Sequence, residues 1–195
     1  MVAVPSTMPA LGTIAPDFSL PDVTGAVVAR TDYTGRPLLV VFLCNHCPFV
    51  KHLADDLARF AREAQRDGVV VVAINSNDID AYPADAPPRM RAEKAARGWD
   101  FPYLLDETQA VAKLYRAACT PDFFLFDPGH RLYYRGQYDE TRPQQIPAQA
   151  PHGGDLRRAV EALVSGKPAP EPQQPSIGCN IKWKPGNAPD YFGAA

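Results

Sequence analysis

The chain has 195 residues, of which 46% are apolar, and its 20 basic and 22 acidic residues leave a formal net charge of −2. This length suits one globular domain with extensions. The sequence has no basic stripe with interleaved aromatic residues and no apolar run near the ~20 residues of a membrane span. We therefore expect neither nucleic acid nor a membrane among its partners.

The N-terminal segment lacks a positively charged region followed by a long apolar core. It does not look like a secretory signal, and we expect a cytoplasmic protein whose cysteines stay reduced. Residues 1–13 are expected to form a loose arm. Residues 18–20 and 26–30 then flank the turn sequence 22–25, which predicts an N-terminal β-hairpin.

The centre of the sequence is the unbroken apolar run 38–43, which has the length of a strand buried on both faces. The next five residues are Cys44, Asn45, His46, Cys47 and Pro48. After them, apolar side chains recur at helical spacing opposite a charged face, at Val50, Leu53, Leu57 and Phe60. The pattern predicts a buried strand, a C-x-x-C pair of thiols and an amphipathic helix, in that order.

A pair of thiols at the start of a helix has a predictable chemistry. The first N–H groups of a helix have no partner within it, and the helix dipole adds partial positive charge there, so a thiolate is stabilised. We expect Cys44 to be the more exposed, attacking thiol. Cys47, one turn further on, would be the covered, resolving thiol. His46 lies between them and would tune the thiolate, shifting the pair toward the oxidising end.

The next segments predict an alternating fold. Residues 69–74 form a second continuous apolar strand, and a strand, helix and strand in this order indicate parallel pairing. Residues 85–96 predict a surface helix with Asp85 as its cap. Residues 103–105 predict a short strand, and the sequence 106–109 resembles a capping box that starts another helix.

The last third of the chain begins with Cys119, Thr120 and Pro121, ahead of an apolar strand. Residues 123–126 and 132–135 flank a turn and predict an antiparallel hairpin. A polar, aperiodic stretch follows and is expected to be a long surface loop. It leads to a final amphipathic helix with apolar positions at Leu156, Val160, Leu163 and Val164.

Two regions result from this pattern. Residues 1–166 are expected to form one domain, and residues 167–195 a proline-rich tail. Apolar residues alternate in the tail, which suggests that it docks onto the body; they are Ile177, Cys179, Ile181 and Trp183.

The C-x-x-C between strand and helix, together with Thr120-Pro121 before a later strand, resembles the thioredoxin-like superfamily. Residues 15–18 are similar to the entry strand of its alkyl hydroperoxide reductase and thiol-specific antioxidant (AhpC/TSA) branch. The resemblance implies the α/β thioredoxin fold, a central mixed sheet flanked by helices, here with an N-terminal hairpin and a C-terminal extension. It also implies a cis peptide bond before Pro121 that faces the dithiol and pairs with an extended substrate.

The sequence departs from the peroxiredoxin pattern P-x-x-x-T-x-x-C. With Cys47 at the peroxidatic position, the threonine position holds Cys44 and the proline position holds Val40. The resemblance therefore implies a thiol-disulfide oxidoreductase that needs no cofactor. Its partners would be a protein or small-molecule disulfide or dithiol and a thiol electron donor. A thiol-dependent peroxidase is the alternative.

Two further hypotheses concern the remaining thiols. A dithiol could hold a soft metal such as Cu(I), with His46, His52 or Cys119 as extra ligands, although we expect no metal here. Cys119 and Cys179 could each supply a third redox thiol. Otherwise Cys119 is a small buried apolar residue, and Cys179 belongs to a structural strap.

Overall fold

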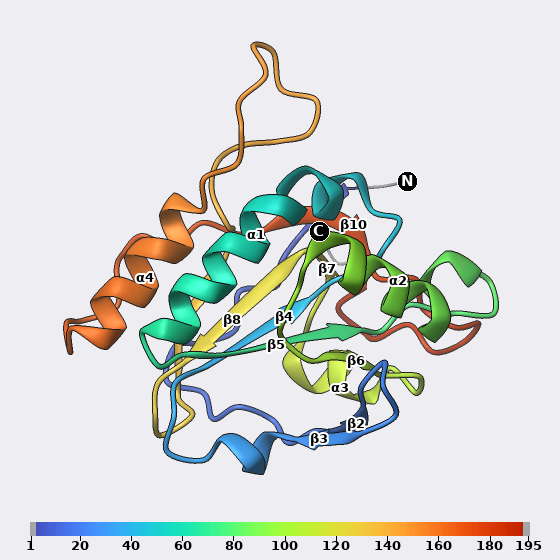
Figure 1. Cartoon of the computed structure of the whole chain (residues 1–195), viewed down its shortest axis with the longest axis horizontal. Helices are drawn as coiled ribbons and strands as arrows, with labels where there is room; N and C mark the ends of the chain where they lie inside the picture. Colours follow the sequence, from blue (N-terminus) through green and yellow to red (C-terminus); the bar gives the residue numbers. More distant parts are fainter. Residues whose placement is uncertain (1–2, 193–195) are drawn as a thin grey trace.

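The computed structural model describes residues 3–192. Within that part of the chain, a mixed five-stranded sheet forms the centre of the fold (Figure 1). Its strand order is β6-β5-β4-β8-β9, with β4, β5 and β6 parallel to one another and β8 and β9 added in antiparallel fashion. The strands are β4 (Leu38–Phe42), β5 (Val70–Asn75), β6 (Tyr103–Leu105), β8 (Asp122–Phe126) and β9 (Leu132–Gly136). The predicted α/β class and central mixed sheet are confirmed.

Strands β4 and β5 are buried at every position, as their continuous apolar sequences predict. Successive side chains of a strand point to opposite faces, so β4 supplies two separate parts of the core. One part includes Leu39, Val41 and Leu43, and the other includes Leu38, Val40 and Phe42.

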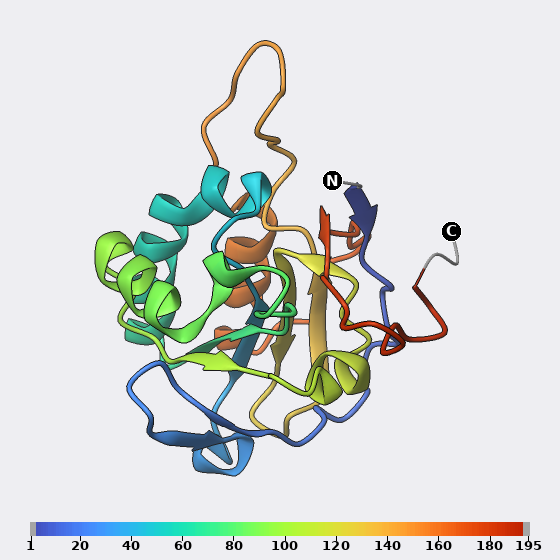
Figure 2. The ribbon, with the colours of Figure 1, turned by 90° about the vertical axis from the view of Figure 1, so that its right-hand side faces the viewer.

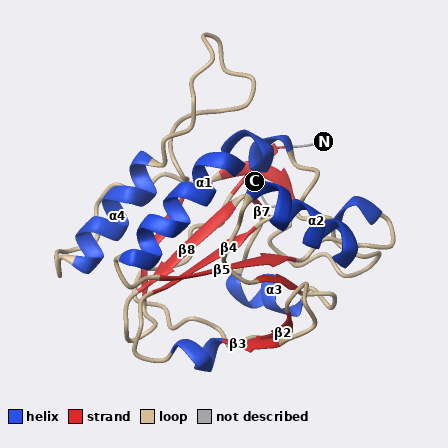
Figure 3. Ribbon diagram, viewed as in Figure 1, coloured by secondary structure: helices blue, strands red, loops and turns tan. Residues whose placement is uncertain are grey.

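Helices cover both faces of the sheet (Figure 2, Figure 3). Helices α1 (Pro48–Arg66), α2 (Pro87–Arg97) and α4 (Gly154–Val164) pack on the face of Leu39 and Val41. The short helix α3 (Ala110–Tyr115) packs on the opposite face through Val111 and Tyr115. Within the described residues, no helix combines the length and apolar character needed to cross a bilayer.

The predicted N-terminal hairpin is confirmed as β2 (Ser19–Pro21) paired antiparallel with β3 (Val27–Ala29). It lies beside the main sheet, where Asp22 bridges to Leu104. Two short 3₁₀ helices, η1 (Arg30–Tyr33) and η2 (Pro83–Asp85), occupy connections.

A smaller sheet with the order β1-β10-β7 joins both ends of the chain to the body. Its strands are β1 (Ala3–Pro5), β7 (Cys119–Thr120) and β10 (Ile177–Asn180). Figure 2 shows β1 and β10 side by side at the edge of the molecule. The expectation of a loose arm over residues 1–13 is therefore wrong for Ala3–Pro5, since β10 supplies a pairing edge that the sequence of the arm does not reveal. Residues 1–2 lie outside the described part.

The long connection between β9 and α4 projects from the body (Figure 1). Ile146 near its tip is 95% exposed. The base of this loop is tied down, because the Asp139 carboxylate accepts hydrogen bonds from the backbone N–H groups of His152 and Gly153 just before α4.

Candidate active site

The C-x-x-C segment connects the end of β4 to the start of α1. The helix begins at Pro48, a position where the missing N–H of proline costs nothing. Cys47 is consequently the N-cap residue, with extended backbone angles of φ −68° and ψ 125°. As the N-cap residue, Cys47 lies next to the N–H groups of the first turn of α1, which have no partner within the helix.

Both sulfur-bearing residues are buried, each with 0% relative exposure. The expected exposure of Cys44 is therefore wrong. The segment after β4 lies beneath other parts of the chain, and β10 of the C-terminal tail packs close to it. A sequence pattern local to the C-x-x-C could not predict this cover.

The two thiols differ in acidity in the opposite sense to the one expected. Hydrogen bonds from the thiols of Cys179 and Cys44, aided by the Val50 N–H, hold the pKa of Cys47 well below its ordinary range despite burial. The pKa of Cys44 is raised well above its ordinary value by its hydrogen bond to Cys47, by burial and by the charge of Asp85. These surroundings favour the thiolate at Cys47 over one at Cys44.

Thr120 and Pro121 face this pair across the site, and the peptide bond between them is cis, as the resemblance implies. The Cys44 Sγ lies 3.2 Å from the Thr120 hydroxyl. The Cys47 Sγ lies 3.1 Å from the Thr120 carbonyl oxygen, a contact that a thiol makes as a donor and a thiolate cannot make. This contact opposes ionisation of Cys47, but the donors gathered around its sulfur outweigh it.

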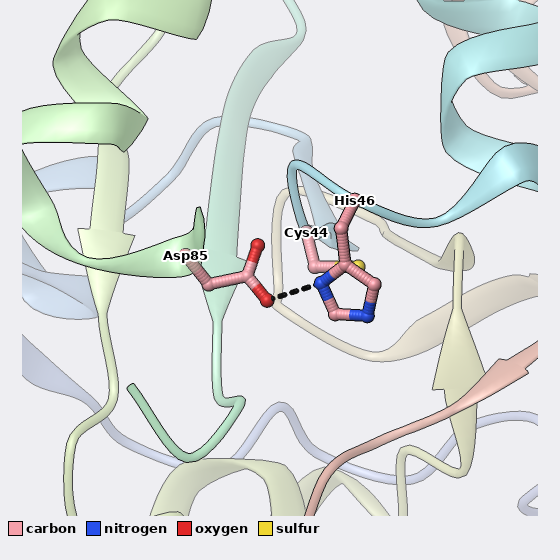
Figure 4. Close-up of side chains that lie close together, drawn as sticks. All are labelled: Cys44, His46 and Asp85. Atoms are coloured by element: carbon pink, nitrogen blue, oxygen red, sulfur yellow. Dashed lines mark hydrogen bonds and ion pairs between the residues drawn. The ribbon is translucent and has the colours of Figure 1, made fainter. Parts of the chain in front are cut away.

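His46 points toward a buried carboxylate that the sequence pattern did not assign to the site (Figure 4). Its Nδ1 lies 2.7 Å from Oδ2 of Asp85, which is fully buried. The imidazole stacks on Tyr82 with ring centroids 5.5 Å apart. These contacts fix the orientation of His46 beside Cys44.

Asp85 also holds the loop itself. Its Oδ1 accepts a 2.7 Å hydrogen bond from the backbone N–H of Asn45, and its Oδ2 accepts one of 2.8 Å from Asn77. The Asn45 side chain donates to the Ala84 carbonyl and accepts from the Tyr103 hydroxyl. Asp85 is thus an anchor of the C-x-x-C segment and not the cap of α2, whose N-cap is Ala86.

Within residues 3–192, Cys44, His46 and Asp85 form a group that could hold a metal ion, since one ligand atom from each lies within 4.8 Å of the others. The carboxylate oxygens of Asp85 are, however, already engaged by Asn45, Asn77 and His46. A metal ion would have to replace those hydrogen bonds. The arrangement fits a hydrogen-bonded network better than a set of metal ligands.

The two candidate third thiols are placed differently. Cys119 is fully buried in β7, and its thiol contacts the Pro121 carbonyl at 3.6 Å. Cys179 in β10 pairs with Thr120 and forms a side-chain hydrogen bond with Cys47. The structure therefore brings Cys179, and not Cys119, into contact with the pair.

Sequence reasoning missed Asp85 and Tyr103 as members of the site. Asp85 lies in the connection that leaves the carboxyl end of β5, whereas Tyr103 is the first residue of β6, which pairs with β5. The carboxyl ends of neighbouring parallel strands are where site residues collect in such sheets. That rule would have directed attention to Asp85, whereas its position before two prolines suggested only a helix start.

The comparisons with known proteins show the family and the fold to which this site belongs. A protein of Geobacillus kaustophilus described as an uncharacterized conserved protein is 50% identical and superposes with a TM-score of 0.90 over 95% of this chain and 98% of its own. The thioredoxin domain of a thiol-disulfide oxidoreductase from Bacteroides vulgatus is 17% identical and has a TM-score of 0.60 over 78% of this chain and 99% of its own, which shows a shared fold.

Among curated proteins, the thiol-disulfide oxidoreductase ResA of Geobacillus thermodenitrificans is 28% identical over 128 residues. The matched segment spans 65% of this chain and 68% of ResA. Residues 11–135 match the AhpC/TSA family, a segment that runs from before the entry strand through the C-x-x-C and cis-proline segments to β9. The chain therefore belongs to the AhpC/TSA family.

Proposed function

We propose that this protein is a thiol-disulfide oxidoreductase in which Cys47 is the attacking thiol and Cys44 the resolving thiol. The observation that carries the assignment is the position of Cys47 at the N-cap of α1, where hydrogen bonds from Cys179 and Cys44 favour its thiolate. The thiolate is the nucleophile in disulfide exchange, so the thiol with the lowered pKa attacks first.

The reaction has two exchange steps. The Cys47 thiolate attacks one sulfur of a substrate disulfide, whose S–S bond breaks, and the departing substrate sulfur leaves as a thiolate and takes up a proton. Cys44 then loses its proton and attacks the Cys47 sulfur, and the second substrate thiol departs. The protein now holds a Cys44–Cys47 disulfide, and two electrons have passed to the substrate.

The surroundings of Cys44 suit this second step. Its raised pKa keeps Cys44 protonated while Cys47 attacks, so the two thiols do not compete for the substrate. The Thr120 hydroxyl, 3.2 Å from the Cys44 Sγ, is placed to accept or pass on the proton that Cys44 releases. His46, held by Asp85, lines the same side of the site and is proposed to tune the pair.

The names of relatives support this class of reaction. ResA, the curated relative, is named a thiol-disulfide oxidoreductase. We propose protein or small-molecule disulfides as substrates and a thiol donor that restores the dithiol. The same steps in reverse would oxidise a substrate dithiol, and the reduction potential of the pair decides the direction.

A trapping experiment tests the assignment of roles. The Cys44→Ser, Cys179→Ser double variant leaves Cys47 without a neighbouring thiol in the site. After addition of oxidised glutathione, mass spectrometry of peptides prepared without reductant should find glutathione on Cys47. The matched Cys47→Ser, Cys179→Ser variant keeps Cys44 and should remain largely unmodified, because burial and the charge of Asp85 still raise the pKa of Cys44. Faster modification of Cys44 than of Cys47 would reverse the assignment.

A further inference from the structure

The C-terminal strand β10 occupies the edge beside the cis-proline, where an extended substrate would pair in a site of this kind. It runs antiparallel to β7, with Cys179 opposite Thr120 and Asn180 opposite Cys119. On its other edge β10 pairs with β1. The strand is therefore held between two neighbours, and the edge of β7 next to the dithiol is already filled by the chain itself.

The residues in and next to β10 allow the strand to lie close to Thr120 and Pro121. A Cβ atom at Gly178 would lie 2.1 Å from the carbonyl oxygen of Thr120, so a larger residue does not fit without movement of the backbone. The Ser176 hydroxyl donates a 2.7 Å hydrogen bond to the carbonyl of Pro121. Both contacts place the strand against the cis-proline segment and fix which side chain of β10 faces the pair.

The β10 side chain that faces the pair is the thiol of Cys179. Cys179 and Cys44 both donate hydrogen bonds to the Cys47 sulfur, so Cys47 contacts one thiol of its own C-x-x-C segment and one from the C-terminal strand β10. The three residues belong to the same buried cluster. Once Cys47 carries a mixed disulfide, its sulfur is open to attack by either neighbour.

Cys179 is also the thiol of the three that lies next to a surface groove. The groove has a volume of about 550 Å³ and is lined by Pro48, Phe49, Arg142, Ile177 and Cys179, among others. Neither Cys44 nor Cys47 lines it. A substrate that approaches through this groove therefore meets Cys179 before it reaches the Cys47 sulfur.

We propose that Cys179 is a third redox thiol, which resolves mixed disulfides on Cys47 by forming a Cys47–Cys179 disulfide. Cys44 then converts this disulfide into the Cys44–Cys47 disulfide. This inference rests on the proposed role of Cys47. In the first step the Cys179 sulfur attacks Cys47, its proton passes to the departing substrate thiolate, and the substrate thiol is released. In the second step Cys44 attacks Cys47, its proton passes to Cys179, and the Cys44–Cys47 disulfide forms. No further oxidant or reductant is needed.

The Cys44→Ser variant tests this step, because it leaves Cys179 as the neighbour able to resolve a mixed disulfide on Cys47. We expect that oxidised glutathione reacts with the reduced variant and leaves as glutathione, and that disulfide mapping finds Cys47 joined to Cys179. Release should be at least about tenfold faster than in the Cys44→Ser, Cys179→Ala double variant at the same thiol concentration, since a neighbouring thiol acts at an effective concentration of millimolar or more.

The controls separate this inference from the proposed function. The Cys44→Ser, Cys119→Ser double variant is the matched control, because it too loses a buried cysteine of the β7–β10 region. It should still form the Cys47–Cys179 disulfide. Glutathione retained on Cys47 in the Cys44→Ser variant, with Cys179 reduced, would overturn the role of Cys179 and leave the role of Cys47 intact. Absence of glutathione from Cys47 in the double variant with Cys179→Ala would overturn both. Cys44→Ala replaces Cys44→Ser if the serine variant lacks the unfolding transition of the wild type.

Discussion

The thiol of Cys179 is expected to lower the pKa of Cys47 by donating a hydrogen bond to its thiolate, the largest influence on that group. The Cys179→Ala substitution removes this donor and leaves the contributions of Cys44 and the Val50 N–H in place. Without this donor the thiolate of Cys47 is less stabilised, whereas the thiol form of Cys47 is little affected. The pKa of Cys47 should therefore rise.

The size of the rise follows from the strength of the lost hydrogen bond. Hydrogen bonds to charged groups contribute about 1.5–3 kcal/mol, and a thiol is a weak donor, so the lower end of that range applies. Since one pKa unit corresponds to about 1.4 kcal/mol, the expected rise is about one unit.

The pKa can be followed through the ultraviolet absorbance of the thiolate in the reduced protein. Below neutral pH this signal reports Cys47, whose pKa is lowered to about 2, because the pKa values of Cys44, Cys119 and Cys179 are raised. Cys119→Ala serves as the matched control and should titrate as the wild type does. Circular dichroism at each pH shows that the protein stays folded. A Cys179→Ala variant with the midpoint of the wild type would refute the account of how the Cys47 thiolate is stabilised.

Three further substitutions test other parts of the site. Asp85→Ala leaves the Asn45 N–H, the Asn77 amide and the His46 imidazole without their acceptor, which costs about 1–3 kcal/mol for each group. Urea denaturation should therefore show that the free energy of unfolding falls by at least about 3 kcal/mol. A decrease below about 1 kcal/mol would mean that the carboxylate does not anchor the loop. Gly178→Ala should lower the free energy of unfolding by about 1–3 kcal/mol, because the new Cβ meets the Thr120 carbonyl. Ile177, on the same strand, is 39% exposed, so Ile177→Ala should lower it by less. Equal effects of the two substitutions would contradict the close approach of β10 to Thr120. His46→Ala removes the imidazole that hydrogen-bonds the Asp85 carboxylate. The Asp85 charge, which raises the pKa of Cys44, is then less shielded from the pair and disfavours the reduced, thiolate-bearing state, so the reduction potential should fall, by about 30 mV for each 1.4 kcal/mol of lost stabilisation. Equilibration in thiol buffers measures the potential, and a rise would show that His46 acts in the opposite sense.

The sequence predicted the features of the site that depend on neighbouring residues. The apolar run of β4, the thiols after it and the periodicity of α1 are all local, and each was found where expected. The roles proposed for the pair differ from those expected, because the expectation treated both cysteines as part of the helix terminus. Proline is favoured at the first position of a helix, so Pro48 itself indicated that Cys47 would be the N-cap.

The remaining features depend on contacts between distant parts of the chain. Asp85 reaches the backbone of Asn45 across 40 positions, and its own neighbours suggest nothing of this. The pairing of Cys179 with Thr120 requires the tail to return to β7, and alternation in the tail indicated docking without a place for it. The strand at Ala3–Pro5 is too short to show a period and forms because β10 provides an edge.

The most direct test of the central claim is the reduction potential of the Cys44–Cys47 pair, measured by equilibration in glutathione or dithiothreitol buffers with mass-spectrometric mapping of each thiol. The account predicts a reversible two-electron couple in which Cys44–Cys47 is the main linkage of the oxidised protein and Cys47–Cys179 is its minor isomer. Cysteines 44 and 47 that both stay reduced across the range, or that pair with Cys119, would contradict it.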